Sequence, residues 1–140
     1  VLFVAPPDVD LSLFNYDSAN SGRYYNYPMY GLGIVASYLK KDGIEVSMIN
    51  LNHETLKACQ DSSAKDDFDF DAVWKEELNK KVTEFNPDFV GITCMFTQTH
   101  RSTVLVCNEI KRLKPNLPLA LGGVHITNAY ANSEQTQSVC

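Results

Sequence analysis

The order in which apolar and amphipathic segments alternate constrains the fold of this chain more than any other feature of its sequence. Four short apolar runs have the length and composition of β-strands, and helical patterns lie between them. The runs span residues 1–5, 46–51, 89–96 and 117–123. Regular alternation of this kind is typical of βαβ units, whose strands form a parallel sheet. The runs around Val90 and Leu119 are apolar nearly throughout, so we expect a sheet with helices on both faces.

Three helices are predicted from apolar spacing and from the residues that follow each stripe. The stripes are Leu32, Val35, Ala36 and Leu39 in the first helix, Trp74, Leu78, Val82 and Phe85 in the second, and Thr103, Val106, Cys107, Ile110 and Leu113 in the third. Gly43 can end the first helix in the left-handed conformation. Pro87 ends the second, because proline disfavours helical backbone in the residue before it. A fourth helix is expected near 129–138.

Length and charge exclude several classes of protein. A chain of 140 residues suits one domain, 1–140, and its net charge of -5 argues against a nucleic-acid-binding surface. No apolar stretch approaches the roughly 20 residues that span a bilayer, so we expect a cytoplasmic protein without a membrane span. Because the chain opens inside the apolar run 1–5, we interpret it as a fragment of a longer protein.

The cysteines do not have the spacing of a metal site. They are Cys59, Cys94, Cys107 and Cys140, far apart in the chain and outside any C-x-x-C pattern. No zinc or iron–sulfur site is therefore predicted, and we expect reduced thiols. Cys94 could act as a nucleophile near a helix N-terminus, with His100 close by in sequence, but a structural role is the more common one for a cysteine in a strand.

The segment GLGIVA at residues 31–36 matches the G-x-G-x-x-A fingerprint of dinucleotide-binding folds. That fingerprint binds a pyrophosphate only where it directly follows strand one and where strand two ends in an acidic residue. Here a long loop intervenes, and strand two ends at Asn50. We interpret Gly31 and Gly33 instead as positions that allow the helix to pack closely on the sheet.

Two other kinds of site are disfavoured by the residues present. Asp67, Asp69 and Asp71 have the spacing of the first ligands in a calcium loop. Ala72 and Leu78, however, stand where such a loop needs Gly and Glu. A phosphoacceptor domain would need an aspartate at the end of strand three, where the sequence reads TCM. The acidic connection at 60–71 is expected to place carboxylates at the N-terminus of the second helix.

A long tyrosine-rich connection from Pro6 to Tyr30 separates strand one from its helix. Its tyrosines are Tyr16, Tyr24, Tyr25, Tyr27 and Tyr30. Loops at the carboxyl ends of parallel strands are where ligands bind in open α/β sheets. The tyrosines could lie against a large planar ligand, or they could cover the end of the sheet or a neighbouring domain.

Strand four ends in LGGVHIT, residues 121–127. Gly122 and Gly123 could allow a ligand to approach the bare backbone, or they could form a simple turn. His125 could bind a ligand, donate a hydrogen bond, or be an ordinary loop histidine.

Three segments together resemble the N-terminal cobalamin (B12)-binding domain of B12-dependent radical SAM enzymes, which include methyltransferases and Mg-protoporphyrin monomethyl ester cyclase-like proteins. The segments are YPMYGLGIVASYLKKDGIEVSMINL, NPDFVGITCMFTQT and LPLALGGVHIT. The resemblance implies a flavodoxin-like, or Rossmann-like, open parallel sheet. It also implies that cobalamin lies against the carboxyl ends of the strands.

The resemblance implies a set of cofactor-binding residues and no catalytic or metal-ligating ones. Thr93 matches a small hydroxyl residue at the end of strand three, and His125 matches a histidine after the paired glycines, although Val124 replaces the commoner proline. Gly122 and Gly123 would make room for the nucleotide tail of cobalamin. Pro28, Tyr30, Gly31 and Leu32 belong to the entry of the first helix.

The sequence departs from the wider B12 fold in one motif. None of the three histidines lies in a D-x-H-x-x-G motif, so the sequence gives no sign of the usual histidine ligand to cobalt. The hypothesis that the resemblance supports is a base-off cobalamin. The C-x-x-x-C-x-x-C cluster that would hold the 4Fe–4S centre and S-adenosylmethionine is also absent. The implied partner is therefore a C-terminal radical SAM domain of the same parent chain.

A fifth strand is expected to be missing, which would leave strand four as an exposed edge open to dimer pairing. The resulting hypothesis is a cobalamin-binding domain that does not turn over substrate alone, within a parent methyltransferase or cyclase-like oxidoreductase. The alternative is a flavodoxin-like module that binds another ligand or a protein without cobalamin.

Overall fold

The protein is an open α/β sheet with helices on both faces, as the sequence predicts. The computed structural model describes residues 1–137. The strands are β1 (Leu2–Ala5), β2 (Ser47–Asn50), β3 (Val90–Thr93) and β4 (Leu119–Gly122). They pair in parallel in the order β2-β1-β3-β4. This is the strand order of flavodoxin-like sheets, in which ligands bind where the order reverses, between β1 and β3.

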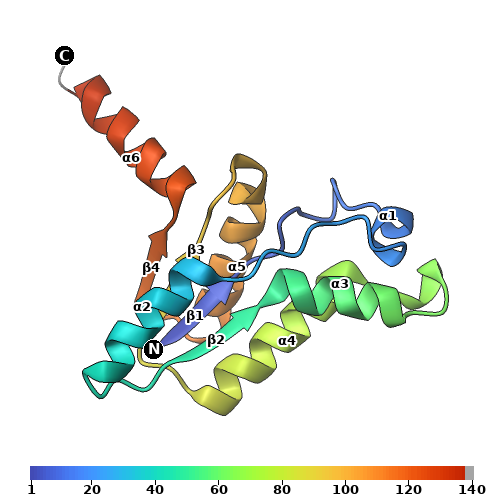
Figure 1. The fold of residues 1–140 in the computed structure, drawn as a ribbon, viewed down its shortest axis with the longest axis horizontal. Coiled ribbons are helices and arrows are strands. Elements are labelled where there is room, and N and C mark those ends of the chain that lie inside the picture. The colour runs from blue at the N-terminus through green and yellow to red at the C-terminus, as the bar shows by residue number, and fades with distance from the viewer. Residues whose placement is uncertain (138–140) are drawn as a thin grey trace.

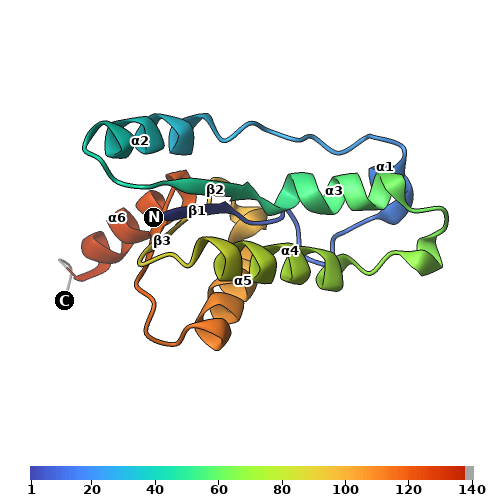
Figure 2. The ribbon, with the colours of Figure 1, turned by 90° about the horizontal axis from the view of Figure 1, so that it is seen from below.

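Six helices connect and flank these strands in the described part of the chain (Figure 1). They are α1 (Tyr16–Asn20), α2 (Tyr30–Lys41), α3 (Leu51–Asp61), α4 (Phe70–Phe85), α5 (His100–Leu113) and α6 (Val124–Gln137). Helix α2 lies on one side of the sheet, and α4 and α5 lie on the other (Figure 2). None of the described helices is both long enough and apolar enough to cross a membrane.

The main core lies between the sheet and α4 and α5. Because side chains alternate along a strand, Leu2 and Val4 of β1 point to the same face. They are packed with Val90 and Ile92 of β3 and with the apolar stripe of α4. The stripe residues Trp74, Leu78 and Val82 of α4, and Val106 and Ile110 of α5, are buried as predicted.

Local capping fixes where the helices begin and end. Asn50 ends β2, and its side chain accepts a hydrogen bond from the His53 N–H, which starts α3. Asp69 accepts one from Ala72 in the same way at the start of α4, so the acidic connection does place a carboxylate there. Gly43 follows α2 at φ 78°, as predicted from the sequence. The Asn50 cap lets α3 begin directly after β2, so no loop separates the two elements.

Helix α3 is missing from the sequence-based prediction. The apolar run 46–51 was predicted to be a strand, but Leu51 already belongs to α3, which continues into the segment expected to be a polar connection. Burial explains the difference: α3 packs on α1 and α4, and Leu51, Leu56 and Cys59 are buried there. Its apolar residues are too few among polar neighbours for the sequence to reveal a stripe.

Two predictions about α2 are wrong. Val35, assigned to the buried stripe, is 47% exposed, whereas Ala36 is buried. Gly31 and Gly33 do not serve close packing, because a Cβ atom on either would meet no atom within 4 Å. The helix contacts the sheet only through part of the predicted stripe, so both glycines face open space.

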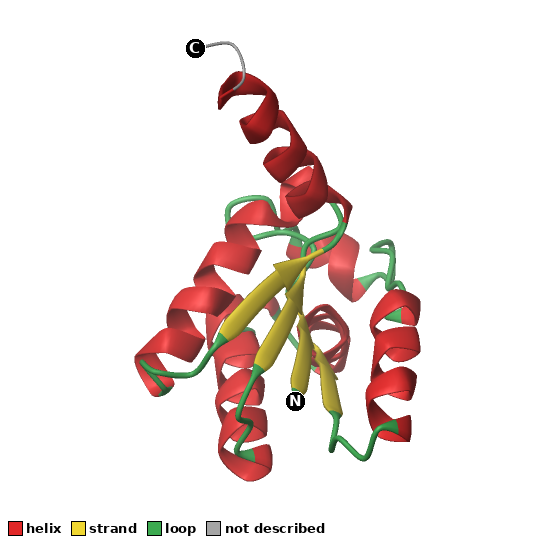
Figure 3. Cartoon of the chain, turned by 90° about the vertical axis from the view of Figure 1, so that its left-hand side faces the viewer, coloured by secondary structure: helices red, strands yellow, loops and turns green. Residues whose placement is uncertain are grey.

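Strand β4 is less covered than the sequence predicts. Leu119 is half-buried, and the rest of β4 is exposed. The strand is the edge of the sheet, and α6 leads away from the body of the molecule instead of returning across it (Figure 3). The helix expected near 129–138 begins earlier, at Val124, and residue 138 lies outside the described residues.

Candidate functional site

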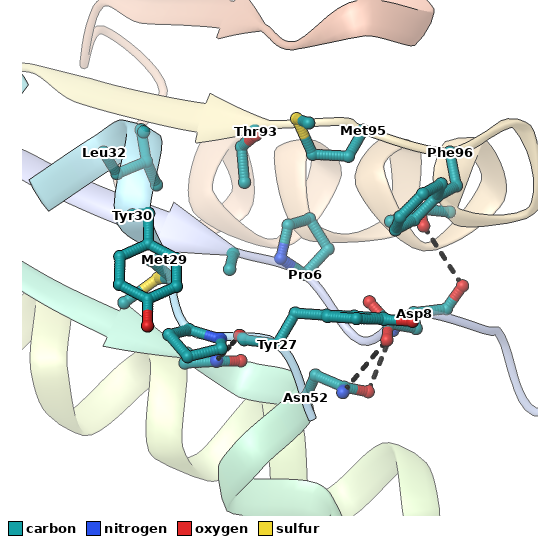
Figure 4. A pocket seen from close by; sticks show the side chains of 15 residues that line it. Pro6, Asp8, Tyr27, Met29, Tyr30, Leu32, Asn52, Thr93, Met95 and Phe96 are labelled. Atoms are coloured by element: carbon teal, nitrogen blue, oxygen red, sulfur yellow. Dashed lines mark hydrogen bonds between the residues drawn. The ribbon is translucent and has the colours of Figure 1, made fainter. Parts of the chain in front are cut away.

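A cavity of about 330 Å³ opens at the carboxyl ends of β1, β2 and β3 (Figure 4). Ala5 and Pro6 line it where β1 ends, Asn50 where β2 ends, and Thr93 where β3 ends. The segment that enters α2, residues 27–32, forms the opposite wall. The cavity thus lies at the point where the strand order reverses, which is where open α/β sheets bind ligands. Its volume is in the range of small-molecule pockets.

The wall of the cavity is largely apolar and aromatic. Tyr27, Met29, Met95 and Phe96 line it. The Tyr27 ring lies 6.1 Å from the Phe96 ring, and it stacks on the Tyr25 ring at 5.7 Å with an interplanar angle of 18°. A flat, partly apolar ligand group would find aromatic faces here.

Asp8 and Asn52 form a hydrogen-bonded pair in the lining of the cavity. The Asp8 backbone N–H donates to Asn52 Oδ1 at 3.0 Å, and Asn52 Nδ2 donates to Asp8 Oδ2 at 3.2 Å. Asn52 Nδ2 also reaches the Tyr25 carbonyl oxygen at 3.4 Å. Burial raises the pKa of the Asp8 carboxyl above its usual value. The pair thus fixes a carboxyl group in a mainly apolar surrounding.

A neighbouring groove of about 560 Å³ extends the site. It shares Asp8, Tyr27 and Phe96 with the cavity and adds Arg23 and Tyr25 on the far side. A ligand larger than the cavity can therefore continue along the same surface. Asp8 lies where the two spaces meet.

Three of the predicted site residues lie in the cavity: Thr93, Tyr30 and Gly31. Gly122 is the register partner of Thr93 on the neighbouring strand, and a Cβ atom on it would meet nothing within 4 Å. The space beside Gly122 is therefore open, next to the strand end that lines the cavity.

Gly123 has a different environment from Gly122. It adopts φ 103°, a conformation that favours glycine, and a Cβ atom there would lie 2.5 Å from the Cys94 carbonyl oxygen. The space beside Gly123 is thus filled by the chain itself. The expectation that both glycines leave room for a ligand fits only Gly122.

His125 does not line the cavity. Its Nε2 lies 3.1 Å from His100 Nδ1, and its Nδ1 lies 3.4 Å from Thr97 Oγ1. Its backbone N–H donates to the Cys94 carbonyl oxygen at 3.3 Å. The histidine therefore joins the first turn of α6 to the start of α5.

The loop tyrosines divide into two groups. Tyr16 and Tyr24 are structural: the Tyr16 hydroxyl lies 2.8 Å from Ser62 Oγ, and the Tyr24 hydroxyl accepts the Asn15 N–H at 2.9 Å. Tyr25, Tyr27 and Tyr30 are exposed beside the cavity and groove. Tyr16 and Tyr24 also pack against the buried cluster of Ala19, Leu56 and Cys59, and Tyr24 borders the groove as well.

Sequence reasoning did not identify Asp8, Asn52, Met95 or Phe96. Asp8 had a usable signal, because a carboxylate three residues after a predicted strand falls at the ligand-binding edge of the sheet. Asn52 had none, since it lies in the first turn of the unpredicted α3. Met95 and Phe96 were assigned to strand three, which ends at Thr93.

The cysteines give no indication of a metal site. Cys59, Cys94 and Cys107 are free thiols, and Cys140 lies outside the described residues. Cys94 is buried, and its thiol donates to the Phe96 carbonyl oxygen at 3.7 Å. Within residues that the structure describes, no three His, Cys, Asp or Glu side chains come together in a way that could hold a metal ion.

Comparisons with known proteins point to one family. The family model described as B12 binding domain matches residues 20–140. A curated relative, cytidylyl-2-hydroxyethylphosphonate methyltransferase of Streptomyces wedmorensis, is 29% identical over 99 residues, which are 71% of this chain and 18% of that protein. The match thus spans less than a fifth of the relative's length. No solved structure matches significantly.

Proposed function

Because the chain belongs to the B12 binding domain family, we propose that it holds cobalamin at the carboxyl ends of β1, β2 and β3. The observation that carries this proposal is the cavity where the strand order reverses, lined by Thr93, Tyr30 and Gly31. These residues come from separate parts of the sequence, and the fold brings them to one edge of the sheet. The cavity and the groove beside it share Asp8, Tyr27 and Phe96, so one ligand can extend from the first into the second.

Each candidate residue has a role that its environment supports. The Thr93 hydroxyl has no hydrogen-bond partner within the described part of the chain, so it is free to bond the ligand. Gly31 and Gly122 leave space where a side chain would intrude. Gly123 allows the turn after β4, and His125 joins that turn to the start of α5 through His100.

Cobalamin is held base-off, with the nucleotide tail in the aromatic cavity. Support comes from the flat faces of Tyr27 and Phe96, against which a nucleotide base can lie. When bound, the cofactor supplies the cobalt chemistry of methyl transfer. This chain binds and orients it without turnover of its own.

The parent protein is a cytoplasmic B12-dependent radical SAM methyltransferase or cyclase-like enzyme. The Streptomyces relative is named as a methyltransferase, which supports methyl transfer. The match covers only 18% of that protein, which supports the proposal of further domains in the parent. The 4Fe–4S cluster and S-adenosylmethionine belong to those domains. The chain itself, residues 1–140, forms the cobalamin-binding module.

The test is a titration of the chain with hydroxocobalamin, followed by absorbance and calorimetry. Gly31→Trp should abolish binding by filling the cavity, and Gly122→Trp should weaken it. Gly33→Trp is the matched control: a Cβ there also meets no atom within 4 Å, but Gly33 lies outside the cavity lining. Base-off binding should change the cobalamin absorbance.

Binding by wild type and by Gly33→Trp, together with loss in Gly31→Trp, would support the proposal. If all three variants still bind cobalamin, the binding site does not lie in this cavity. If the wild-type chain shows no binding at high micromolar cobalamin, the alternative is the better description: a flavodoxin-like module that binds another ligand or a protein.

A further inference from the structure

We propose that Asp8 determines which corrinoids this site accepts, by accepting a hydrogen bond from a neutral amide of the ligand and repelling a carboxylate in its place. The inference rests on the proposed cobalamin function and adds a specificity-determining residue to it. Asp8 lies at the junction of cavity and groove, so a ligand that occupies both passes this side chain.

Asn52 holds the Asp8 carboxyl group in one orientation. It is 7% exposed, and its amide is engaged on both sides, by the Asp8 N–H at Oδ1 and by Asp8 Oδ2 and the Tyr25 carbonyl at Nδ2. The Asp8 backbone is fixed a second time, because Thr99 Oγ1 donates to its carbonyl oxygen at 3.2 Å. Asn52 therefore acts as a positioning residue.

The other carboxyl oxygen, Asp8 Oδ1, has no hydrogen-bond partner in the part of the chain that the structure describes. Nor is the charge paired: the ion pairs among these residues join Arg101 to Asp10 and Arg112 to Glu109. A carboxyl oxygen on a mainly apolar wall, without an ion-pair partner, is stabilised by a ligand that donates an N–H. Burial raises the pKa of Asp8, which agrees with a site that lacks such a donor until the ligand binds.

The chemistry of cobalamin supplies the donor. The rim of its corrin ring carries primary carboxamides, each with two N–H groups. Hydrolysis of one amide gives a corrinoid monocarboxylic acid of nearly the same shape, in which a donor has become an anion. Two carboxylates facing each other in a partly buried site repel, so Asp8 should reject the acid and accept the amide.

The experiment compares cobalamin with its monocarboxylic acids at pH 7 by calorimetry, on wild type and on Asp8→Asn. Wild type should bind cobalamin at least about 10-fold more tightly than one of the acids. Asp8→Asn should weaken cobalamin binding about 10-fold and reduce or reverse the preference, because the new amide can donate to a carboxylate. Asp88→Asn makes the same change at the opposite end of β3 and should behave as wild type. Unfolding midpoints verify that all three proteins are folded.

The outcomes separate the two proposals. If wild type binds cobalamin and Asp8→Asn keeps the same affinity and preference, the role of Asp8 is wrong and the cobalamin site stands. If wild type binds none of the corrinoids, the proposed function fails and this inference fails with it. If Asp8→Asn weakens all corrinoids equally, Asp8 shapes the site without determining specificity, which also overturns the inference.

Discussion

A Cβ atom placed on Gly123 would lie 2.5 Å from the carbonyl oxygen of Cys94. The two residues follow the ends of adjacent strands, and Cys94 N–H donates to the Gly122 carbonyl oxygen at 2.7 Å. The turn from β4 into α6 therefore closes against β3 with no space for a side chain. Gly123 also has a φ of 103°, which is a second reason for glycine at this position.

Gly123→Ala should lower the free energy of unfolding by about 1–3 kcal/mol from backbone strain, with a further cost from the clash with Cys94. Urea denaturation measures the change. Gly122→Ala is the matched control and should stay within about 0.5 kcal/mol of wild type, because a Cβ there meets no atom within 4 Å. Equal stability of the two variants would contradict the prediction.

Asp10→Asn should make the protein less sensitive to acid. The Ser12 hydroxyl and N–H donate to the buried Asp10 carboxylate and Arg101 lies near, so its folded pKa is below the usual 3.8. A carboxyl group with a lowered pKa stabilises the fold above pH 3.8 and loses that contribution as pH falls through the folded value.

At pH 7 the Asp10→Asn variant should lose about 1 kcal/mol of stability through the weaker hydrogen bonds. Below the usual pKa of the carboxyl group, the difference from wild type should shrink. Denaturation series across pH 2–7 measure this, with the exposed Asp17→Asn as the control. If the difference in the free energy of unfolding between wild type and Asp10→Asn is the same at every pH, the lowered pKa of Asp10 is wrong.

Thr93→Val should weaken cobalamin binding by about 2- to 10-fold while leaving the fold intact. Valine keeps the shape of threonine and removes the hydroxyl, which faces the cavity without a partner in the described residues. Calorimetric titration with hydroxocobalamin gives the ratio. Thr83→Val on the exposed side of α4 is the control. An unchanged affinity would show that the Thr93 hydroxyl does not bond cobalamin.

The isolated chain should dimerise through β4. In the described part of the chain this strand pairs only with β3, so its outer edge offers free backbone groups to a second copy. Sedimentation velocity over a concentration series should show a dimer. Leu121 lies on β4 and is 45% exposed. The variant Leu121→Lys places a charge at this edge and should shift the equilibrium toward the monomer. Leu105→Lys on α5 is the control, and a monomer at every concentration would contradict the prediction.

Much of the fold could be predicted because strands and most helices carry local patterns. The runs around Leu2, Ile49, Val90 and Leu119 are strands, and the stripe at Trp74 marks a buried helix face. Recognition of the cobalamin-binding family from short segments is confirmed by the family match. Helix α3 was missed because its burial against α1 and α4 depends on contacts that no single stretch of sequence contains.

The candidate site shows the same division between sequence and structure. The sequence by itself placed Thr93 and Gly122 near the carboxyl ends of two predicted strands, and such ends meet at one edge of a parallel sheet. Only the tertiary structure brought Asp8 of the first loop onto Asn52 of α3, and only it filled the space beside Gly123 with the backbone of Cys94. Strand ends follow from local hydrophobicity, whereas contacts between loops depend on how the helices between them pack.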